Sequence, residues 1–278
     1  MNCNVSVSLV AYKTKKEQLA TFLDCLMRSD FSDIFVVDNS PTDELRDFVG
    51  KYPSKVQYIF GQGNVGYGSG HNIGIRKSLE KGIPYHLVSN IDISFNPDVI
   101  EKIVSFMNRH SDVGALIPRT CYPDGRSQVI TFLYPTPYDM IGRRLLPNFI
   151  YNRRREKYEL KPNGFEVTRN VPIICGCFMF LRTSVLEESG LFDENIFMYF
   201  EDNDLSRRIH AVSKLAYYPK VSIIHESTEE HRKNKKLLFQ SIKSAIYYFN
   251  KWGWFFDKER REVNKQAFSD INIIKDAD

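Results

Sequence analysis

The sequence predicts an α/β fold, with a mostly parallel central sheet flanked by helices and followed by a helical tail. One observation carries this fold prediction, and a second indicates where a ligand binds. Short β-rich apolar segments alternate with segments whose apolar residues recur at helical spacing, a pattern typical of parallel sheets covered by helices. Polar residues also follow directly after several of the apolar segments. Because ligands of such sheets bind at the carboxyl ends of the strands, these residues indicate a binding site.

The predicted elements follow one another in a regular order. The segment 5–12 is rich in β-forming residues, and 15–28 carries Leu19, Phe22, Leu23 and Leu26 at helical spacing. The further predicted strands are 34–37, 56–60, 85–89 and 113–117, with helices at 42–49, 72–81 and 97–109. From Pro118 to Pro172, proline, glycine and arginine interrupt the pattern, which predicts a hairpin and then a long, partly mobile loop.

Regular structure is predicted to resume near Ile173 and to continue to His225. The tail from Lys235 is predicted to be helical, because its apolar residues recur at helical spacing: Leu237, Leu238, Ile242, Ala245, Ile246 and Phe249. We therefore divide the chain into a main domain of residues 1–235 and a C-terminal helical extension of residues 236–278.

Composition narrows the functional classes. The 278 residues suit one large α/β domain with an appendage, and a net charge of +4 is too small to indicate nucleic-acid binding. Five cysteines without a CxxC pair indicate a reducing, cytoplasmic compartment. Cys175 and Cys177 are expected in one strand, and no bridge between them is predicted. No apolar run reaches ~20 residues, and the N-terminus lacks signal-peptide features.

An acidic cluster is the strongest chemical signal in the chain. Glu201, Asp202 and Asp204 stand at the predicted start of a helix, directly after an aromatic patch that contains Phe200. Carboxylates this close repel one another, and proteins usually accept such a cluster where a metal, a cationic partner or proton transfer uses it. The alternative is helix capping, because acids at a helix N-terminus interact favourably with the helix dipole.

Other polar residues stand at predicted strand ends. Asp38 can accept hydrogen bonds from a nucleobase or ribose, or can simply cap a turn. Asn90 and Asp92 suit a hard cation such as Mg²⁺ or Mn²⁺ together with a diphosphate, or can form an Asx turn. His225 ends the apolar run KVSIIH, where it can complete a metal site or serve as an ordinary structural histidine.

A glycine-rich segment is predicted to form a loop at 61–70 before a helix. Its glycines, counting one inside that helix, are Gly61, Gly63, Gly66, Gly68, Gly70 and Gly74. Glycines let the backbone approach a ligand, and a following helix N-terminus favours a diphosphate. The position and spacing match neither a Rossmann fingerprint nor a Walker A loop. The alternative is a long, tight loop without a ligand.

The order of these signals resembles the family 2 inverting glycosyltransferases of the GT-A fold, and most closely their rhamnosyl- and galactofuranosyl-type branch. The matching segments are VVDNSPTDE, GNVGYGSGHNIGI, LVSNIDISF, GCFMFLRTSVLEESGLFDENIFMYFEDNDLSRR and IIHES. The resemblance covers roughly residues 5–250 and rests on five separated motifs in the same order. It implies a catalytic domain over 1–235.

The resemblance also implies roles for individual residues. Asp202 matches the catalytic base, and Glu201 supports it. The implied donor-binding residues are Ala11, Tyr12, Asp38, Asn64, Gly66, Asn72 and Asn90. Asp92 and His225 match the metal ligands, with Asn90 in place of the first acid of the family's DxD motif. The implied acceptor residues are Asp204, Gly176 and Cys177, and Asp204 is expected to orient the acceptor or Arg207.

The implied reaction moves a sugar from a nucleoside diphosphate donor to a saccharide acceptor with inversion, and dTDP-rhamnose is the first choice of donor. UDP-galactofuranose, UDP-hexoses and GDP-sugars stay open. Mg²⁺ or Mn²⁺ is the expected cofactor, and a lipid-linked glycan in cell-surface polysaccharide assembly is the expected acceptor. A non-catalytic nucleotide-sugar-binding scaffold is the main alternative. A nucleotidyltransferase is disfavoured, because AYKTKKEQ after the first strand lacks glycine.

Two basic and apolar segments predict peripheral contact with the inner face of a membrane. One is 142–157, where Arg143, Arg144, Arg153, Arg154 and Arg155 flank apolar residues. The other is the aromatic stretch 251–261, which contains Lys251, Lys258, Arg260 and Arg261. The alternative is a solvated loop and a tail packed on the main domain. The tail could also mediate homodimer formation, and a nucleic-acid partner is not expected.

Overall fold

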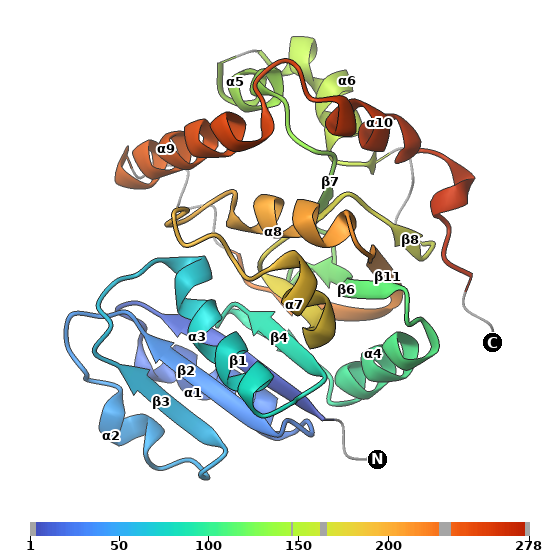
Figure 1. Ribbon diagram of the computed structural model, residues 1–278. Helices are drawn as coiled ribbons and strands as arrows, with labels where there is room; N and C mark the ends of the chain where they lie inside the picture. Colours follow the sequence, from blue (N-terminus) through green and yellow to red (C-terminus); the bar gives the residue numbers. More distant parts are fainter. Residues whose placement is uncertain (1–3, 146, 162–165, 228–234, 276–278) are drawn as a thin grey trace.

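The computed structural model describes residues 4–145, 147–161, 166–227 and 235–275 (Figure 1). Its strands are β1 (Val5–Ala11), β2 (Asp33–Asp38), β3 (Val56–Phe60), β4 (Tyr85–Ser89), β5 (Ile93–Phe95), β6 (Val113–Cys121), β7 (Thr131–Phe132), β8 (Arg169–Asn170), β9 (Ile173–Ile174), β10 (Phe178–Arg182) and β11 (Lys214–His225). Its helices are α1 (Lys16–Met27), α2 (Arg46–Val49), α3 (Tyr67–Glu80), α4 (Asp98–Arg109), α5 (Pro137–Leu145), α6 (Asn148–Tyr158), α7 (Thr183–Ser189), α8 (Glu201–His210), α9 (Lys235–Trp252) and α10 (Lys258–Gln266). A short 3₁₀ helix spans Asp270–Asn272.

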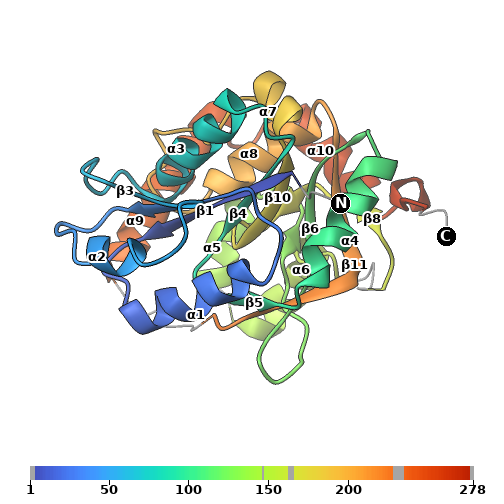
Figure 2. The ribbon, with the colours of Figure 1, turned by 90° about the horizontal axis from the view of Figure 1, so that it is seen from below.

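The main sheet has the strand order β3-β2-β1-β4-β10-β6-β11-β5, and β8 also pairs with β11. Strands β3, β2, β1 and β4 are parallel, whereas β10 runs antiparallel between β4 and β6. Helices α3, α7 and α8 cover one face, and α1 and α4 cover the other (Figure 2). The prediction of a central sheet flanked by helices is confirmed.

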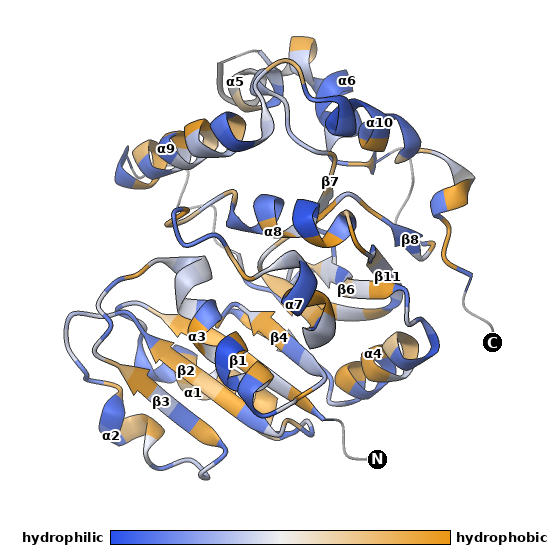
Figure 3. Ribbon diagram, in the orientation of Figure 1, coloured by the Kyte–Doolittle hydropathy of each residue, from blue (hydrophilic) through white to orange (hydrophobic). Residues whose placement is uncertain are grey.

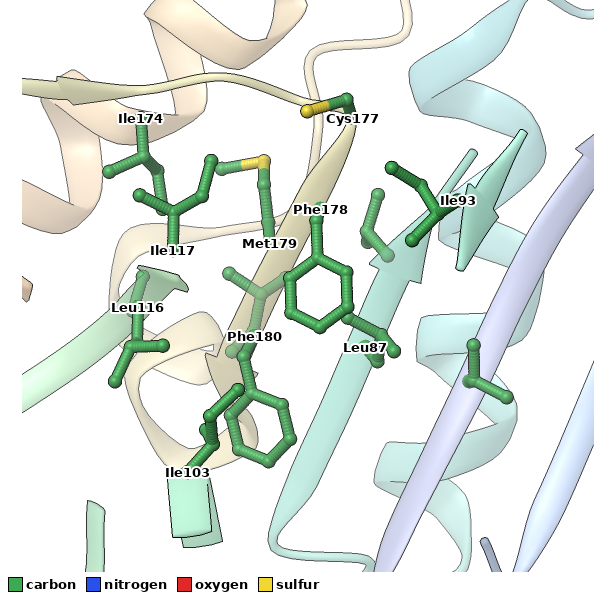
Figure 4. Packing of buried hydrophobic residues seen from close by; sticks show 14 of the residues in the cluster. Leu87, Ile93, Ile103, Leu116, Ile117, Ile174, Cys177, Phe178, Met179 and Phe180 are labelled. Atoms are coloured by element: carbon green, nitrogen blue, oxygen red, sulfur yellow. The ribbon is translucent and has the colours of Figure 1, made fainter. Parts of the chain in front are cut away.

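Apolar side chains from both faces of β10 form the centre of the core. Phe178 and Phe180 point toward Leu87 of β4 and Ile103 of α4, and Met179 lies beside Ile117 (Figure 4). Each of these side chains is fully or almost fully buried. Figure 3 shows the same pattern for the molecule, with apolar strands inside and polar helix surfaces outside. Burial on both faces explains why these strands read as nearly continuous apolar runs.

The glycine-rich segment is helical further toward its N-terminus than predicted. Helix α3 begins at Tyr67, so the loop ends at Gly66 and the predicted start at residue 72 is wrong. A Cβ on Gly70 would lie 2.7 Å from Val10, and one on Gly74 would lie 2.6 Å from Ser8. The later glycines therefore let α3 lie directly on β1, which is a packing role that spacing alone did not reveal.

The predicted loop over 118–172 is also partly wrong, because it contains α5 and α6. Arg154 of α6 binds the buried Asp139 of α5 through two hydrogen bonds of 2.6 and 2.7 Å, and Tyr151 donates to the carbonyl of Asp139. The pair of helices is held by these polar contacts, which the proline and arginine content obscured. The helix predicted over 42–49 forms only at Arg46–Val49.

Helices α5, α6, α9 and α10 form a separate layer on the outer side of α8 (Figure 1). The inner side of α9 buries Ser241, Ser244, Tyr248 and Phe249. The predicted helical tail is confirmed, and its residues pack against α8. The division of the chain at residue 235 stays a prediction. Among the residues described, no helix is long and apolar enough to cross a membrane.

Candidate active site

Chain segments that are far apart in sequence meet at the carboxyl ends of β1, β2 and β4. Ala11 and Asp38 are paired neighbours at the ends of β1 and β2. Asn90 follows β4, and its amide donates to the carbonyl of Cys177, 2.9 Å away. His225 ends β11 opposite Ile93, next to Asp92. The structure therefore brings most of the predicted polar residues to one edge of the sheet.

Asp92 and His225 face each other at this edge. The Nε2 atom of His225 lies 3.4 Å from Oδ1 of Asp92 and 3.4 Å from Nδ2 of Asn90. The buried Oδ1 atom of Asp92 has no hydrogen-bond partner among the described residues. A buried carboxylate oxygen without a partner is costly unless a cation or a donor satisfies it. This pair fits a divalent cation.

Gln128 orients the imidazole of His225. Its Nε2 donates to the carbonyl oxygen of His225 at 2.7 Å, and its Oε1 lies 3.0 Å from Nδ1 of the ring. Because an amide oxygen only accepts, Nδ1 carries the proton and Nε2 presents a lone pair toward Asp92. A histidine held in this way is the usual metal-binding arrangement. Nothing in the sequence around Gln128 singled it out.

Few side chains that can bind a metal lie at this site. Within the described part of the chain, no three His, Cys, Asp or Glu side chains gather around one point. Asp92 and His225 would therefore hold a cation with the help of water and ligand oxygens, as Mg²⁺ and Mn²⁺ accept. The amide of Asn90 is the third polar group within reach of the pair.

Asp202 stands at the start of α8, on the other side of Gly176. Its Oδ2 accepts from the Gly176 amide at 3.0 Å, and its Oδ1 accepts from the backbone and side chain of Asn203, both at 2.8 Å. Burial raises the pKa of Asp202, and these hydrogen bonds offset part of the rise. A carboxylate with a raised pKa is better suited to accept a proton near neutral pH.

Glu201 differs from its neighbour. It is buried, and its Oε2 has no hydrogen-bond partner in the part of the chain that the structure describes. Burial raises the pKa of Glu201 well above its ordinary value, and the nearby Asp202 charge adds to the rise. These causes favour the neutral form of Glu201, which reduces the repulsion between neighbouring carboxylates that the sequence indicated.

The turn before Asp202 is strained. Tyr199 and Phe200 have φ values of 65° and 69°, in the left-handed region that residues with a Cβ seldom adopt. Each such residue costs roughly 1–2 kcal/mol, so the surroundings must hold it in place. Gly66 faces the same turn, because a Cβ there would lie 2.3 Å from the carbonyl oxygen of Phe197.

Tyr67 connects the two sides of the site. Its hydroxyl lies 2.9 Å from Oδ1 of Asn90 and 2.7 Å from the carbonyl oxygen of Gly176, and it can donate to either. Burial raises the pKa of Tyr67 well above its ordinary value, so the hydroxyl stays protonated. Sequence reasoning missed Tyr67, because it lies in the segment predicted to be a glycine loop.

The predicted nucleotide residues differ in their surroundings. Asp38 is buried and accepts from Tyr58 at 2.7 Å and from the Ser40 amide at 2.9 Å. Tyr12 is half exposed, and Asn64 is exposed beside Gly66. These residues stay candidates for contact with a nucleotide.

Asn72 is fully buried. Its side chain exchanges hydrogen bonds with the backbone of Phe192 and donates to Glu194. These contacts fasten α3 to the segment before α8. They favour a structural role over the predicted contact with the donor.

The predicted role of Asp204 does not match its surroundings. It is fully buried and binds Arg208, Lys251 and the Trp252 indole at 2.8–2.9 Å. Arg207 binds Asp257 and Glu259 instead. The expected contacts of Asp204 with an acceptor or with Arg207 are therefore replaced by contacts to α9 and within α8.

The segment around Gly176 is irregular. Cys175 and Cys177 lie between β9 and β10, so the expectation that both belong to one strand is wrong. Cys177 is buried and joins the site through its carbonyl oxygen, and Gly176 is buried beside Asp202. Gly176 remains a candidate for acceptor contact.

The chain is similar in sequence to known glycosyltransferases. The chain is 28% identical over 208 residues to the low-salt glycan biosynthesis hexosyltransferase Agl10 of Haloferax volcanii, which covers 74% of this chain and 61% of the relative. It is 27% identical over 231 residues to an N-acetylglucosaminyl-diphospho-decaprenol L-rhamnosyltransferase of Mycobacterium tuberculosis, covering 78% of this chain and 73% of the relative. The chain thus spans about three fifths of the length of the Haloferax protein.

The fold is shared with solved structures. GalNAc-T7 with UDP, GalNAc and Mn²⁺ superposes with a TM-score of 0.63 over 96% of this chain and 56% of that chain, at 13% identity. A profile of glycosyl transferase family 2 matches residues 6–190, which includes Asp38, Asn90 and Asp92 but ends before Asp202. The predicted resemblance is confirmed: the chain belongs to glycosyl transferase family 2.

Proposed function

We propose that this protein is an inverting glycosyltransferase that moves a sugar from a nucleoside diphosphate donor to a saccharide acceptor. One observation carries the proposal. Tyr67 bridges the Asn90 side of the site, with its Asp92–His225 pair, to the Gly176 side, where Asp202 is bound. The site thus has a cation-binding pair on one side and a candidate base on the other. This arrangement suits a reaction that releases a diphosphate and deprotonates an alcohol.

In the proposed reaction Asp202 takes the proton of the acceptor hydroxyl while that oxygen bonds to the anomeric carbon. The bond between this carbon and the diphosphate oxygen breaks, and the electron pair leaves with the diphosphate. The hydrogen bonds from Gly176 and Asn203 orient the carboxylate for this transfer. A positioned base typically contributes ~10²–10⁴-fold to a rate. A divalent cation held by Asp92 and His225 would stabilise charge on the diphosphate.

The donor we propose first is dTDP-rhamnose. The name of the Mycobacterium relative supports a rhamnosyl donor, and the name of the Haloferax relative supports a broader hexosyl class. UDP-galactofuranose and UDP-hexoses remain the alternatives, together with GDP-sugars. We propose that the diphosphate lies at Asn90. The nucleotide would be bound beside it by Asp38, Ala11, Tyr12, Asn64 and Gly66.

A donor panel tests the function. We expect one of dTDP-rhamnose, UDP-galactose, UDP-galactofuranose, UDP-glucose, UDP-N-acetylglucosamine and GDP-mannose to raise the unfolding temperature with Mn²⁺ and to be slowly hydrolysed. Asp92→Ala should abolish both effects. Asp98→Ala is the matched control, because Asp98 pairs with Lys102 on the exposed side of α4. A shift without turnover in any acceptor extract would favour the non-catalytic scaffold, and no response to any donor would contradict the proposal.

We also propose that the acceptor is lipid-linked and that the protein docks on the cytoplasmic face of an anionic membrane. The segments 140–155 and 235–256 contain five arginines and four lysines, respectively, and no acidic residue. Both lie in the outer layer of helices (Figures 1 and 3). The exposed apolar side chains described in these segments are Phe149, Ile150, Leu238, Phe239, Ile242, Ile246, Trp254, Phe255 and Phe256. Basic residues around exposed apolar side chains suit anionic headgroups.

The structure narrows this proposed surface. Trp252 lies against Arg207 and donates to Asp204, so it is unavailable to lipid. The structure does not describe the side chains of Arg143 and Arg144. It also does not describe residues 231–234, which precede α9. Flotation with vesicles containing phosphatidylglycerol should recover the protein, and Phe239→Asp with Phe255→Asp should release it. Ile271→Asp is the control, because Ile271 is 83% exposed outside these segments. No flotation of the wild type would contradict docking.

A further inference from the structure

The C-terminal helices hold the part of the chain that carries Asp202. We infer that the side chains of this extension that face the turn 198–200 and α8 form a positioning element, which sets the place of this carboxylate. They are Ser244, Tyr248, Phe249, Lys251, Trp252 and Asp257. The inference rests on the proposed role of Asp202. It adds a function to the extension, which the family match over residues 6–190 does not include.

The first contacts are made at the strained turn. The hydroxyl of Ser244 on α9 donates to the carbonyl oxygen of Met198 at 2.8 Å. The ring of Phe200 packs against Tyr248 and Phe249, with ring centroids 5.3 and 6.2 Å apart, and forms a small apolar cluster separate from the main core. The left-handed turn directly before Asp202 is therefore held by α9 and not by its own sequence.

The second set of contacts holds α8 itself. Asp204 is bound by Lys251 and by the indole of Trp252, both at 2.8 Å. Arg207 is buried and makes two hydrogen bonds to Asp257, at 2.7 and 2.8 Å. Its guanidinium also stacks on Trp252, with 4.1 Å to the ring centroid. Trp252 thus contacts both of the charged residues that tie α8 to the extension.

Helix geometry separates these contacts from the reacting group. Phe200, Asp204 and Arg207 are four and three residues apart, so they lie on one face of the helix. Asp202 is two residues from Asp204, which is about 200° around the helix, and it faces Gly176 instead. A movement of the face held by the extension would therefore displace Asp202, although no residue of the extension contacts it among the hydrogen bonds of the described residues.

The experiment compares two tryptophan variants of the full chain. Trp252→Phe removes the indole donor to Asp204 and weakens the stacking on Arg207. Trp254→Phe is the matched control outside this set, because the Trp254 indole donates to Asn250 of α9 itself and phenylalanine keeps an aromatic ring against Phe249. We prefer these variants to changes at Arg207, because removing one partner of a buried charge pair can unfold the protein. Ser244→Ala tests the contact with the turn separately.

We expect Trp252→Phe to lower kcat about ten- to hundredfold with the donor KM unchanged, because small misplacements of a catalytic group have effects of this size. Ser244→Ala should lower kcat less, and Trp254→Phe should match the wild type. Unfolding temperatures and donor affinity are measured on the same samples, at a temperature where all variants are folded. The acidic limb of the kcat profile should also move in Trp252→Phe, since Asp202 would lose part of its hydrogen bonding.

Each outcome bears on one idea. Equal kcat for Trp252→Phe and Trp254→Phe would overturn the positioning role, as would a loss of kcat that follows the loss of folded protein. If Asp202→Asn retains full turnover, Asp202 is not the base. That result tests the base role separately from the role of the extension. A low kcat in both Asp202→Asn and Trp252→Phe, with normal donor affinity, supports the inference.

Discussion

The two halves of the active site are built in different ways. On the donor half, Ala11, Asp38 and Asn90 stand at the ends of parallel strands, and the ladder pairing places them. On the base half, Asp202 follows two residues in the left-handed region and depends on contacts from α9. The difference teaches that the donor half follows from local pattern and sheet register, whereas the base half depends on distant packing.

The strongest test of this comparison is Asp202→Asn. The amide keeps the size of the side chain but cannot accept a proton, so we expect turnover to fall by ~10²–10⁴-fold. Donor affinity, measured by calorimetry with Mn²⁺, should stay within about twofold, because the donor half does not use Asp202. A parallel loss of donor affinity would show that the two halves are not separate.

The next test concerns Gln128, which is far from His225 in sequence but contacts its imidazole in the donor half. Gln128→Leu removes the acceptor of the His225 Nδ1 proton. We expect Mn²⁺ affinity to fall about 10–100-fold, the usual effect of losing such a partner. Mn²⁺ binding is followed by electron paramagnetic resonance.

Gln240→Leu is the control for Gln128→Leu, because Gln240 bonds only to Ser244 of α9 in the contacts described. An unchanged Mn²⁺ affinity in Gln128→Leu would mean that Gln128 does not set the orientation of the imidazole.

The third test concerns the polar network beneath the donor half. His86 is fully buried, and its ring nitrogens bind the hydroxyls of Ser8 on one side and of Ser6 and Ser78 on the other. Burial lowers the pKa of His86 to about 3, against about 6.5 in the unfolded chain. The unfolded chain therefore binds more protons between these values, and the free energy of unfolding falls as the pH falls below about 6.5.

At pH 5 this single group should cost about 2 kcal/mol of stability relative to pH 7.5. Urea unfolding at both pH values gives the difference. His86→Gln should flatten the dependence by about that amount, because glutamine does not titrate. An identical pH dependence in the variant would show that other groups, and not His86, account for it.

Much of the site could be predicted from the sequence, and the exceptions have physical causes. Asp38, Asn90, Asp92 and His225 were found because a polar residue after an apolar run marks the end of a strand. Tyr67 and Gln128 were missed, because a tyrosine in a glycine-rich segment and a glutamine in a loop carry no local signal. Their roles arise only from the partners that the fold brings to them.

The sequence by itself determined most strands and helices of residues 1–117, the polar residues at the strand ends and the acidic cluster at the start of α8. These features depend on neighbours one to four residues away, which periodicity records. Only the tertiary structure decided that Glu201 is buried without a partner for one oxygen, that Asp204 faces α9 and that Asp202 faces Gly176. Three carboxylates in four positions look alike in sequence, and burial and partners from distant segments set them apart.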